Sequence, residues 1–178
     1  FNLEGWEIVD TAYPTLDPTG EFFMAPVLDE NNNPVLSVFD VFQTERGRVT
    51  AIVSHGFAGP KHLVINDPPS IWSFDEPERE PYFIGSNKVK VAQVEPYGVV
   101  YEQAGGVYFL GVDGGAADRI SDDKLVDVLE DRALFRSLND DGGYDFILYD
   151  LRAREEVGRV ASPINGISGT LNVRLVSR

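Results

Sequence analysis

The two histidines of the chain, His55 and His62, are the first candidates for chemistry, because they lie close together in the sequence beside a glycine-rich turn. A zinc-type metal site would need a further ligand, and Asp67 or Asp75 could supply a carboxylate. Nothing in the spacing of these four residues demands a metal. We therefore expect both histidines to be structural or surface residues, and we predict no metal site.

A nucleophile is equally hard to assign. Ser54 directly precedes His55, but neighbours on an extended chain point to opposite faces and cannot form a Ser–His pair. The sequence has no Gly-x-Ser-x-Gly elbow, no P-loop and no Gly-x-Gly-x-x-Gly loop before a helical pattern. We predict no catalytic residue of this kind and no bound cofactor.

The segment 29–40 imitates a calcium loop, with Asp29, Asn31, Asn33 and Asp40 at the positions of ligands. Pro34 occupies the position that requires glycine, and the residues after it read as a strand. An extended strand cannot curl around an ion, so the segment favours a hairpin over a calcium site.

Adjacent carboxylates are abundant, at 122–123, 130–131 and 140–141. A glycosidase would use a pair of carboxylates at a fixed separation. With 29 acidic residues in the chain, however, some pairing is expected by chance. An enzyme therefore remains an alternative interpretation.

Composition limits the classes of partner. The 15 Lys and Arg residues against 29 Asp and Glu residues give a formal net charge of −14, which opposes binding to nucleic acid. The chain has no cysteine, and no apolar run approaches the roughly 18 residues of a transmembrane helix. Such acidity suits a salty or extracytoplasmic setting, so a periplasmic or secreted location is slightly favoured.

The elements that would position these residues follow a regular pattern. Four short apolar runs each end in an aspartate, at 36–40, 71–75, 109–113 and 146–150, and the aspartates are 35, 38 and 37 residues apart. A second strand is predicted before each run, at 21–28, 61–65, 97–101 and 132–136. A third is predicted after each run, at 48–53, 81–84, 117–120 and 156–161.

A first strand is also suggested for three of the units, at 6–9, 88–94 and 125–129, whereas the second unit offers only a poor candidate at 56–59. Turn-forming residues separate the strands. The aligned runs are apolar on both faces, which is typical of strands in stacked sheets. A unit of four short strands is typical of a propeller blade.

The stretches 16–20, 105–115 and 143–150 resemble blades of the TolB-like and WD40-like β-propeller families. This resemblance implies a binding platform and supplies no functional residue. We predict an all-β fold, a small β-propeller of about four short blades, with a β-sandwich or barrel as the alternative. The expected units of this single domain are roughly 12–55, 56–86, 87–122 and 123–162, with a closing strand within 163–178 that completes the blade begun near Trp6.

The resulting hypothesis is a non-catalytic protein-binding or scaffolding module, a subunit or accessory domain of a larger assembly. Trp6, Phe57 and Tyr97 lie near predicted turns and are the candidate partner-binding residues, because aromatic side chains are enriched at interfaces. The alternative is a hydrolase with a carboxylate or His/Asp metal site at the propeller channel. A third possibility is a structural linker domain with no specific ligand.

Overall fold

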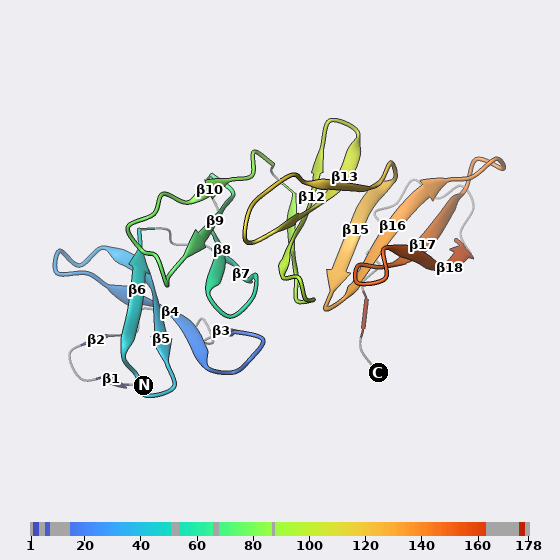
Figure 1. Cartoon of the computed structure of the whole chain (residues 1–178). Helices are drawn as coiled ribbons and strands as arrows, with labels where there is room; N and C mark the ends of the chain where they lie inside the picture. Colours follow the sequence, from blue (N-terminus) through green and yellow to red (C-terminus); the bar gives the residue numbers. More distant parts are fainter. Residues whose placement is uncertain are drawn as a thin grey trace. The chain divides into compact units, whose positions relative to one another are not determined.

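A computed structural model describes residues 2–3, 6–7, 15–50, 54–65, 68–86, 88–162 and 175–176 (Figure 1). All regular structure in these ranges is β-strand, so the prediction of an all-β fold is confirmed. No helix in this part of the chain is long and apolar enough to cross a membrane. The chain divides into two compact units, Phe1–Gly85 and Ser86–Arg178, and each is described by itself.

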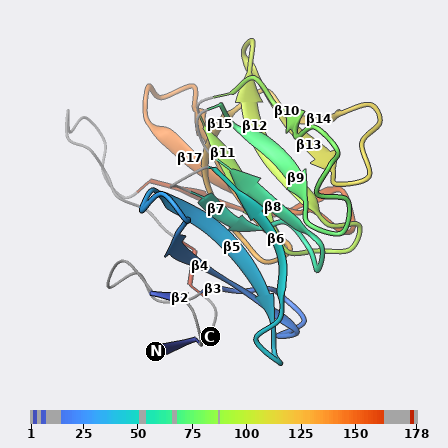
Figure 2. The same cartoon turned by 90° about the vertical axis from the view of Figure 1, so that its left-hand side faces the viewer.

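The first unit contains a two-stranded hairpin and two four-stranded antiparallel sheets among its described residues. The hairpin pairs β1 (Asn2–Leu3) with β2 (Trp6–Glu7). Sheet 1 consists of β3 (Thr15–Leu16), β4 (Phe22–Leu28), β5 (Pro34–Asp40) and β6 (Glu45–Val49), and sheet 2 consists of β7 (Ser54–Phe57), β8 (His62–Ile65), β9 (Ser70–Ser73) and β10 (Tyr82–Phe83). Figure 2 shows β4, β5 and β6 side by side.

The second unit contains two further four-stranded antiparallel sheets among the residues described. Sheet 3 consists of β11 (Val89–Ala92), β12 (Gly98–Gln103), β13 (Gly106–Gly111) and β14 (Asp118–Ser121). Sheet 4 consists of β15 (Lys124–Leu129), β16 (Arg132–Leu138), β17 (Tyr144–Asp150) and β18 (Glu155–Ala161). In each of the four sheets, every strand pairs with its neighbours in the sequence.

The four aligned apolar runs coincide with or overlap β5, β9, β13 and β17, which are the third strands of the four sheets. The strands predicted before each run are also present, as are those predicted after the second, third and fourth runs. The strand predicted at 48–53 shares only residues 48 and 49 with β6, and 51–53 lie outside the described residues. The poor candidate at 56–59 corresponds to β7, which pairs with β8. The predicted closing strand lies mostly outside the described residues.

The prediction of 6–9 as the first strand of the first unit is wrong, because Trp6–Glu7 pairs with β1 instead. The strand that pairs with β4 is β3, only two residues long. The turn between β3 and β4 is held by Asp17, whose Oδ1 accepts a hydrogen bond from the Phe22 N–H at 2.8 Å. Asp17 Oδ2 accepts a second one from the Thr19 N–H at 3.0 Å.

The core of the first unit lies between sheets 1 and 2. Sheet 1 contributes Met24, Leu36 and Val38, and sheet 2 with its turns contributes Phe57, Leu63, Ile65, Trp72 and Phe74. The opposite face of sheet 1 is buried as well, through Ala25, Val27, Val35 and Phe39. Strand β5 is therefore buried on both faces, as its apolar sequence predicts.

The core of the second unit lies between sheets 3 and 4. It contains Val100, Val107 and Phe109 from sheet 3, and it contains Leu125, Ala133, Phe135, Ile147 and Leu151 from sheet 4 and the turn after it. Sheet 3 also buries Val99 and Leu110, which alternate with these core residues along β12 and β13. A cation–π contact adds to this packing, because the Arg154 guanidinium lies 4.4 Å from the centre of the Phe109 ring.

Candidate functional site

Aspartate carboxylates hold the turns at the ends of the sheets. Asp40 Oδ1 accepts hydrogen bonds from the Phe42 and Thr44 N–H groups, each at 2.9 Å. Its Oδ2 accepts one from Arg46 Nε at 3.0 Å. The backbone hydrogen bond from Thr44, aided by Arg46, lowers the pKa of Asp40 below its ordinary value of 3.8. Asp40 is therefore a structural anion that fixes the β5–β6 turn.

Asp150 does the same for the β17–β18 turn. Its Oδ1 accepts hydrogen bonds from the Arg152 and Ala153 N–H groups, each at 2.8 Å, and its Oδ2 lies 2.8 Å from Arg132 Nη1. The backbone hydrogen bond from Ala153 is the largest cause of the lowered pKa of Asp150. Two of the four aligned aspartates thus have a turn-forming role.

The β4–β5 turn, where the sequence imitates a calcium loop, is also closed by a carboxylate. Asp29 Oδ1 accepts hydrogen bonds from the Asn31 and Asn33 N–H groups, each at 2.8 Å. The bond from Asn33 is the largest cause of the lowered pKa of Asp29. Asp40 lies at the other end of β5 from this turn, so the hairpin interpretation of the segment is confirmed.

The β5–β6 turn presents two apolar side chains to solvent. Val41 is 56% exposed and Phe42 is 85% exposed, although their turn is fixed by Asp40. In the matching β17–β18 turn, the residue after the aspartate is Leu151, which is only 1% exposed. Phe42 was not among the candidates predicted from the sequence, where the available signal was an aspartate followed directly by two apolar residues in a turn.

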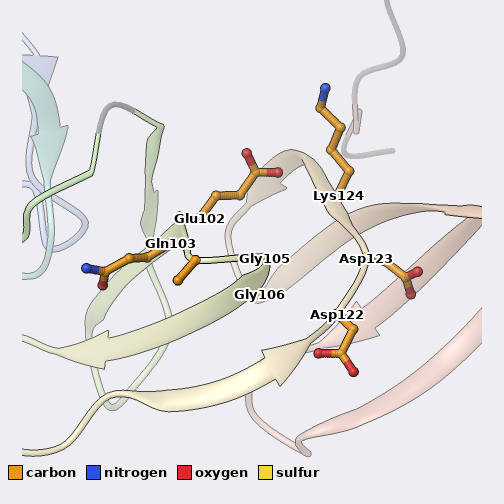
Figure 3. A pocket seen from close by; sticks show the side chains of 8 residues that line it. Glu102, Gln103, Gly105, Gly106, Asp122, Asp123 and Lys124 are labelled. Atoms are coloured by element: carbon orange, nitrogen blue, oxygen red, sulfur yellow. The ribbon is translucent and has the colours of Figure 1, made fainter.

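A hollow of about 330 Å³ lies in the second unit between two turns (Figure 3). The β12–β13 turn lines it with Glu102, Gln103, Ala104, Gly105 and Gly106, and the β14–β15 turn lines it with Asp122, Asp123 and Lys124. Three carboxylates line this hollow, and a glycosidase would use two at a fixed separation, so the contacts of these carboxylates test the hydrolase alternative.

Each of these carboxylates already has a partner in the protein. Glu102 Oε1 accepts a hydrogen bond from the Leu125 N–H at 2.7 Å, Asp122 forms an ion pair with Arg119, and Asp123 Oδ2 lies 3.4 Å from the Ser121 hydroxyl. Figure 3 shows the Glu102, Asp122 and Asp123 carboxylates pointing in different directions. They do not converge on a common point, which a general acid and base acting on one bond must do.

The residues considered for a metal are not brought together by the described structure. His62 is half-buried in β8, and Asp75 forms an ion pair with Lys61. The His55 side chain and Asp67 lie outside the described residues. Within the part of the chain that is described, no group of three or more His, Asp or Glu side chains is arranged to hold a metal ion.

The three aromatic residues proposed to bind a partner have different surroundings. Phe57 is 1% exposed and packs edge-on against Phe74, with 6.1 Å between ring centres. It is a core residue, with no surface to offer a partner while this core is intact. Tyr97 is half-buried directly before β12, and its carbonyl accepts a hydrogen bond from the Val112 N–H at 3.0 Å. The Trp6 side chain lies outside the described residues.

Within its described ranges, the chain is thus an all-β protein whose main sheets are four-stranded antiparallel meanders with aspartate-held turns. No family model, curated protein or solved structure matches it.

Proposed function

We propose that this chain is a non-catalytic protein-binding or scaffolding module, acting as a subunit or accessory domain of a larger assembly. We further propose that its four-stranded sheets are blades of a small β-propeller. Consecutive four-stranded meanders and third strands buried on both faces, as in β5 and β13, support the propeller proposal. Proteins of this architecture present rigid turns at the ends of their sheets.

The exposure of Phe42 on an aspartate-held turn is the observation that carries the functional proposal. Aromatic side chains dominate the energetics of many protein interfaces. A turn that is already fixed by Asp40 loses little conformational entropy when it binds, which favours affinity. The hydrogen bonds of Asp40 hold the backbone that carries Phe42 without covering the Phe42 ring.

The test starts from a partner that co-purifies with the tagged chain under mild conditions. Phe42→Ala is expected to weaken the affinity for that partner at least tenfold, the size of a modest hot spot of about 1.4 kcal/mol. Phe83→Ala is the matched control, because Phe83 is 60% exposed on the edge strand β10 and not on a held turn. If alanine substitutions at the turns never reduce binding, the proposal is wrong.

A further inference from the structure

Sheet 4 has one face in the core of the second unit and an opposite face that we call the outer face. Phe135 and Ile147 point into the core. The residues that alternate with them therefore point outward. The strand register pairs Leu134 with Leu148, Phe146 with both Arg136 and Val160, and Leu138 with Tyr144, so these side chains share the outer face.

The outer face is apolar and partly exposed. Leu138 is 70% exposed, Tyr144 is 41% exposed and Val160 is 67% exposed. All three lie on the neighbouring strands β16, β17 and β18, which Figure 1 shows side by side. Contiguous apolar surface of this kind is a feature of interaction sites.

The same face carries two cations side by side. The register places Lys124 of β15 directly opposite Arg136 of β16, and like charges in that arrangement repel each other. Neither forms an ion pair with any described residue. The chain has a net charge of −14, and the cations Lys88 and Arg119 in the same unit each have a carboxylate partner.

Arg136 contacts an aromatic ring of the same face. Its guanidinium lies over the Tyr144 ring, 4.5 Å from the ring centre. Stacking on an aromatic ring holds the guanidinium plane while its N–H groups still point outward in that plane. A carboxylate could then accept two parallel hydrogen bonds from it.

Asp127 and Asp150, acidic residues that the register places on this face, are engaged elsewhere. Asp150 forms an ion pair with Arg132, the residue opposite it. Asp127 lies opposite Leu134. Its Oδ1 is 3.5 Å from Lys90 Nζ, and its Oδ2 accepts a hydrogen bond from the Leu175 N–H at 3.1 Å. Asp127 therefore does not neutralise Lys124 and Arg136.

We propose that the outer face of sheet 4 binds an acidic, apolar segment of a partner protein. A carboxylate of the partner segment lies between Lys124 and Arg136. The apolar side chains of the same segment cover Leu138, Tyr144 and Val160. The inference rests on the proposed protein-binding function and adds the chemistry of the partner. A polyanion such as nucleic acid fits less well, because the net charge of −14 repels it.

The experiment is a nuclear magnetic resonance titration of the whole ¹⁵N-labelled chain. The acidic probe is a capped peptide in which glutamate alternates with an apolar residue, either valine or phenylalanine. The basic control peptide has the same apolar residues and lysine in place of each glutamate. The acidic peptide is expected to shift amide signals of β15 to β17, and the basic peptide is not. The double variant Lys124→Gln, Arg136→Gln should weaken this binding at least tenfold. The control Arg152→Gln, which removes an exposed cation from the β17–β18 turn, should leave it unchanged.

Four results would overturn the inference. Equal shifts with both peptides, or an equal loss in the Arg152→Gln control, would mean that binding does not depend on the cation pair. Shifts at sheet 4 that depend on protein concentration alone would mean that a second copy occupies the face. Binding of neither peptide would mean that the face is not a docking surface. The Phe42 experiment is independent of all four results, so the proposed function can stand or fail separately.

Discussion

Gly98, the first residue of β12, offers a sharp test of the packing in the second unit. It lies opposite Gly111 of β13. A Cβ atom at Gly98 would lie 2.2 Å from the Leu110 carbonyl oxygen and 2.8 Å from Phe109 Cζ. The Leu110 oxygen would have to retreat by about 1 Å to reach the 3.4 Å at which ordinary contact begins. That movement would separate β12 from β13 and displace Phe109 from the core.

Gly98→Ala is therefore expected to destabilise the protein by about 2–4 kcal/mol, as overpacking and weakened backbone hydrogen bonds add together. With a denaturant dependence of about 2 kcal/mol per molar urea, the unfolding midpoint should fall by about 1–2 M. Far-UV circular dichroism in urea measures this midpoint. Amide hydrogen exchange in β12 and β13 should show reduced protection at the same positions.

Gly158→Ala is the matched control, because both glycines lie in strands of the second unit and a Cβ at Gly158 would meet nothing within 4 Å. Alanine there removes the entropic disadvantage of glycine, so the variant should be unchanged or up to about 1 kcal/mol more stable. If the two variants behave alike, the close approach of β12 and β13 at Gly98 is refuted.

Three further predictions concern the turns and the cores. Asp40→Asn should reduce the loss of stability that urea unfolding shows as the pH falls below the ordinary aspartate pKa of 3.8. The lowered pKa of Asp40 stabilises the folded protein above that ordinary value, and this stabilisation is lost as the pH falls through the folded-state pKa. Arg154→Met should cost about 1 kcal/mol in the same assay, because it removes the cation–π contact with Phe109. Phe39→Ala should cost about 3–5 kcal/mol, since Phe39 is 1% exposed, whereas Phe42→Ala should change stability by less than about 0.5 kcal/mol.

Each of these has an outcome that contradicts it. An unchanged pH profile in Asp40→Asn would mean that Asp40 is not a structural anion. Arg152→Met is the control for Arg154, because Arg152 is an exposed neighbour in the same turn, and equal losses would argue against the cation–π contact. A large loss in Phe42→Ala would mean that its ring is packed and not displayed.

The strands that the sequence predicts best are those with long apolar runs. The runs ending at Asp40 and Asp150 match the ends of β5 and β17, because most residues of these runs are apolar and each run stops at a turn-forming aspartate. Only β5 of the two is buried on both faces. Strand β3 was missed because two residues, one of them the 61% exposed Leu16, produce no periodic pattern. Strand β7 was a poor candidate because the segment 56–59 begins and ends with glycine, which has little β-strand preference.

The candidate surfaces were harder to predict from the sequence. The opposition of Lys124 and Arg136 depends on the exact register of β15 against β16, which includes an irregularity after Leu125, and a shift of one residue would place Arg136 on the other face. The position of Phe57, a predicted partner-binding residue, also depends on strand pairing. Phe57 lies near a turn in the sequence, but the pairing of β7 with β8 places it in the core.

The order of strands within each sheet has a consequence for how the protein is made. Every main sheet in the described chain is built from one continuous stretch of sequence, and no strand crosses from one of these sheets to another. During synthesis, sheet 1 has all its strands once residue 49 has left the ribosome, before sheet 2 exists. Local pairing of this kind closes only short loops, so each sheet can form in the order of translation. The apolar face of sheet 1 or sheet 3 is then exposed only until about 40 further residues have been made, at most some seconds of elongation, when the sheet that shares its core is complete.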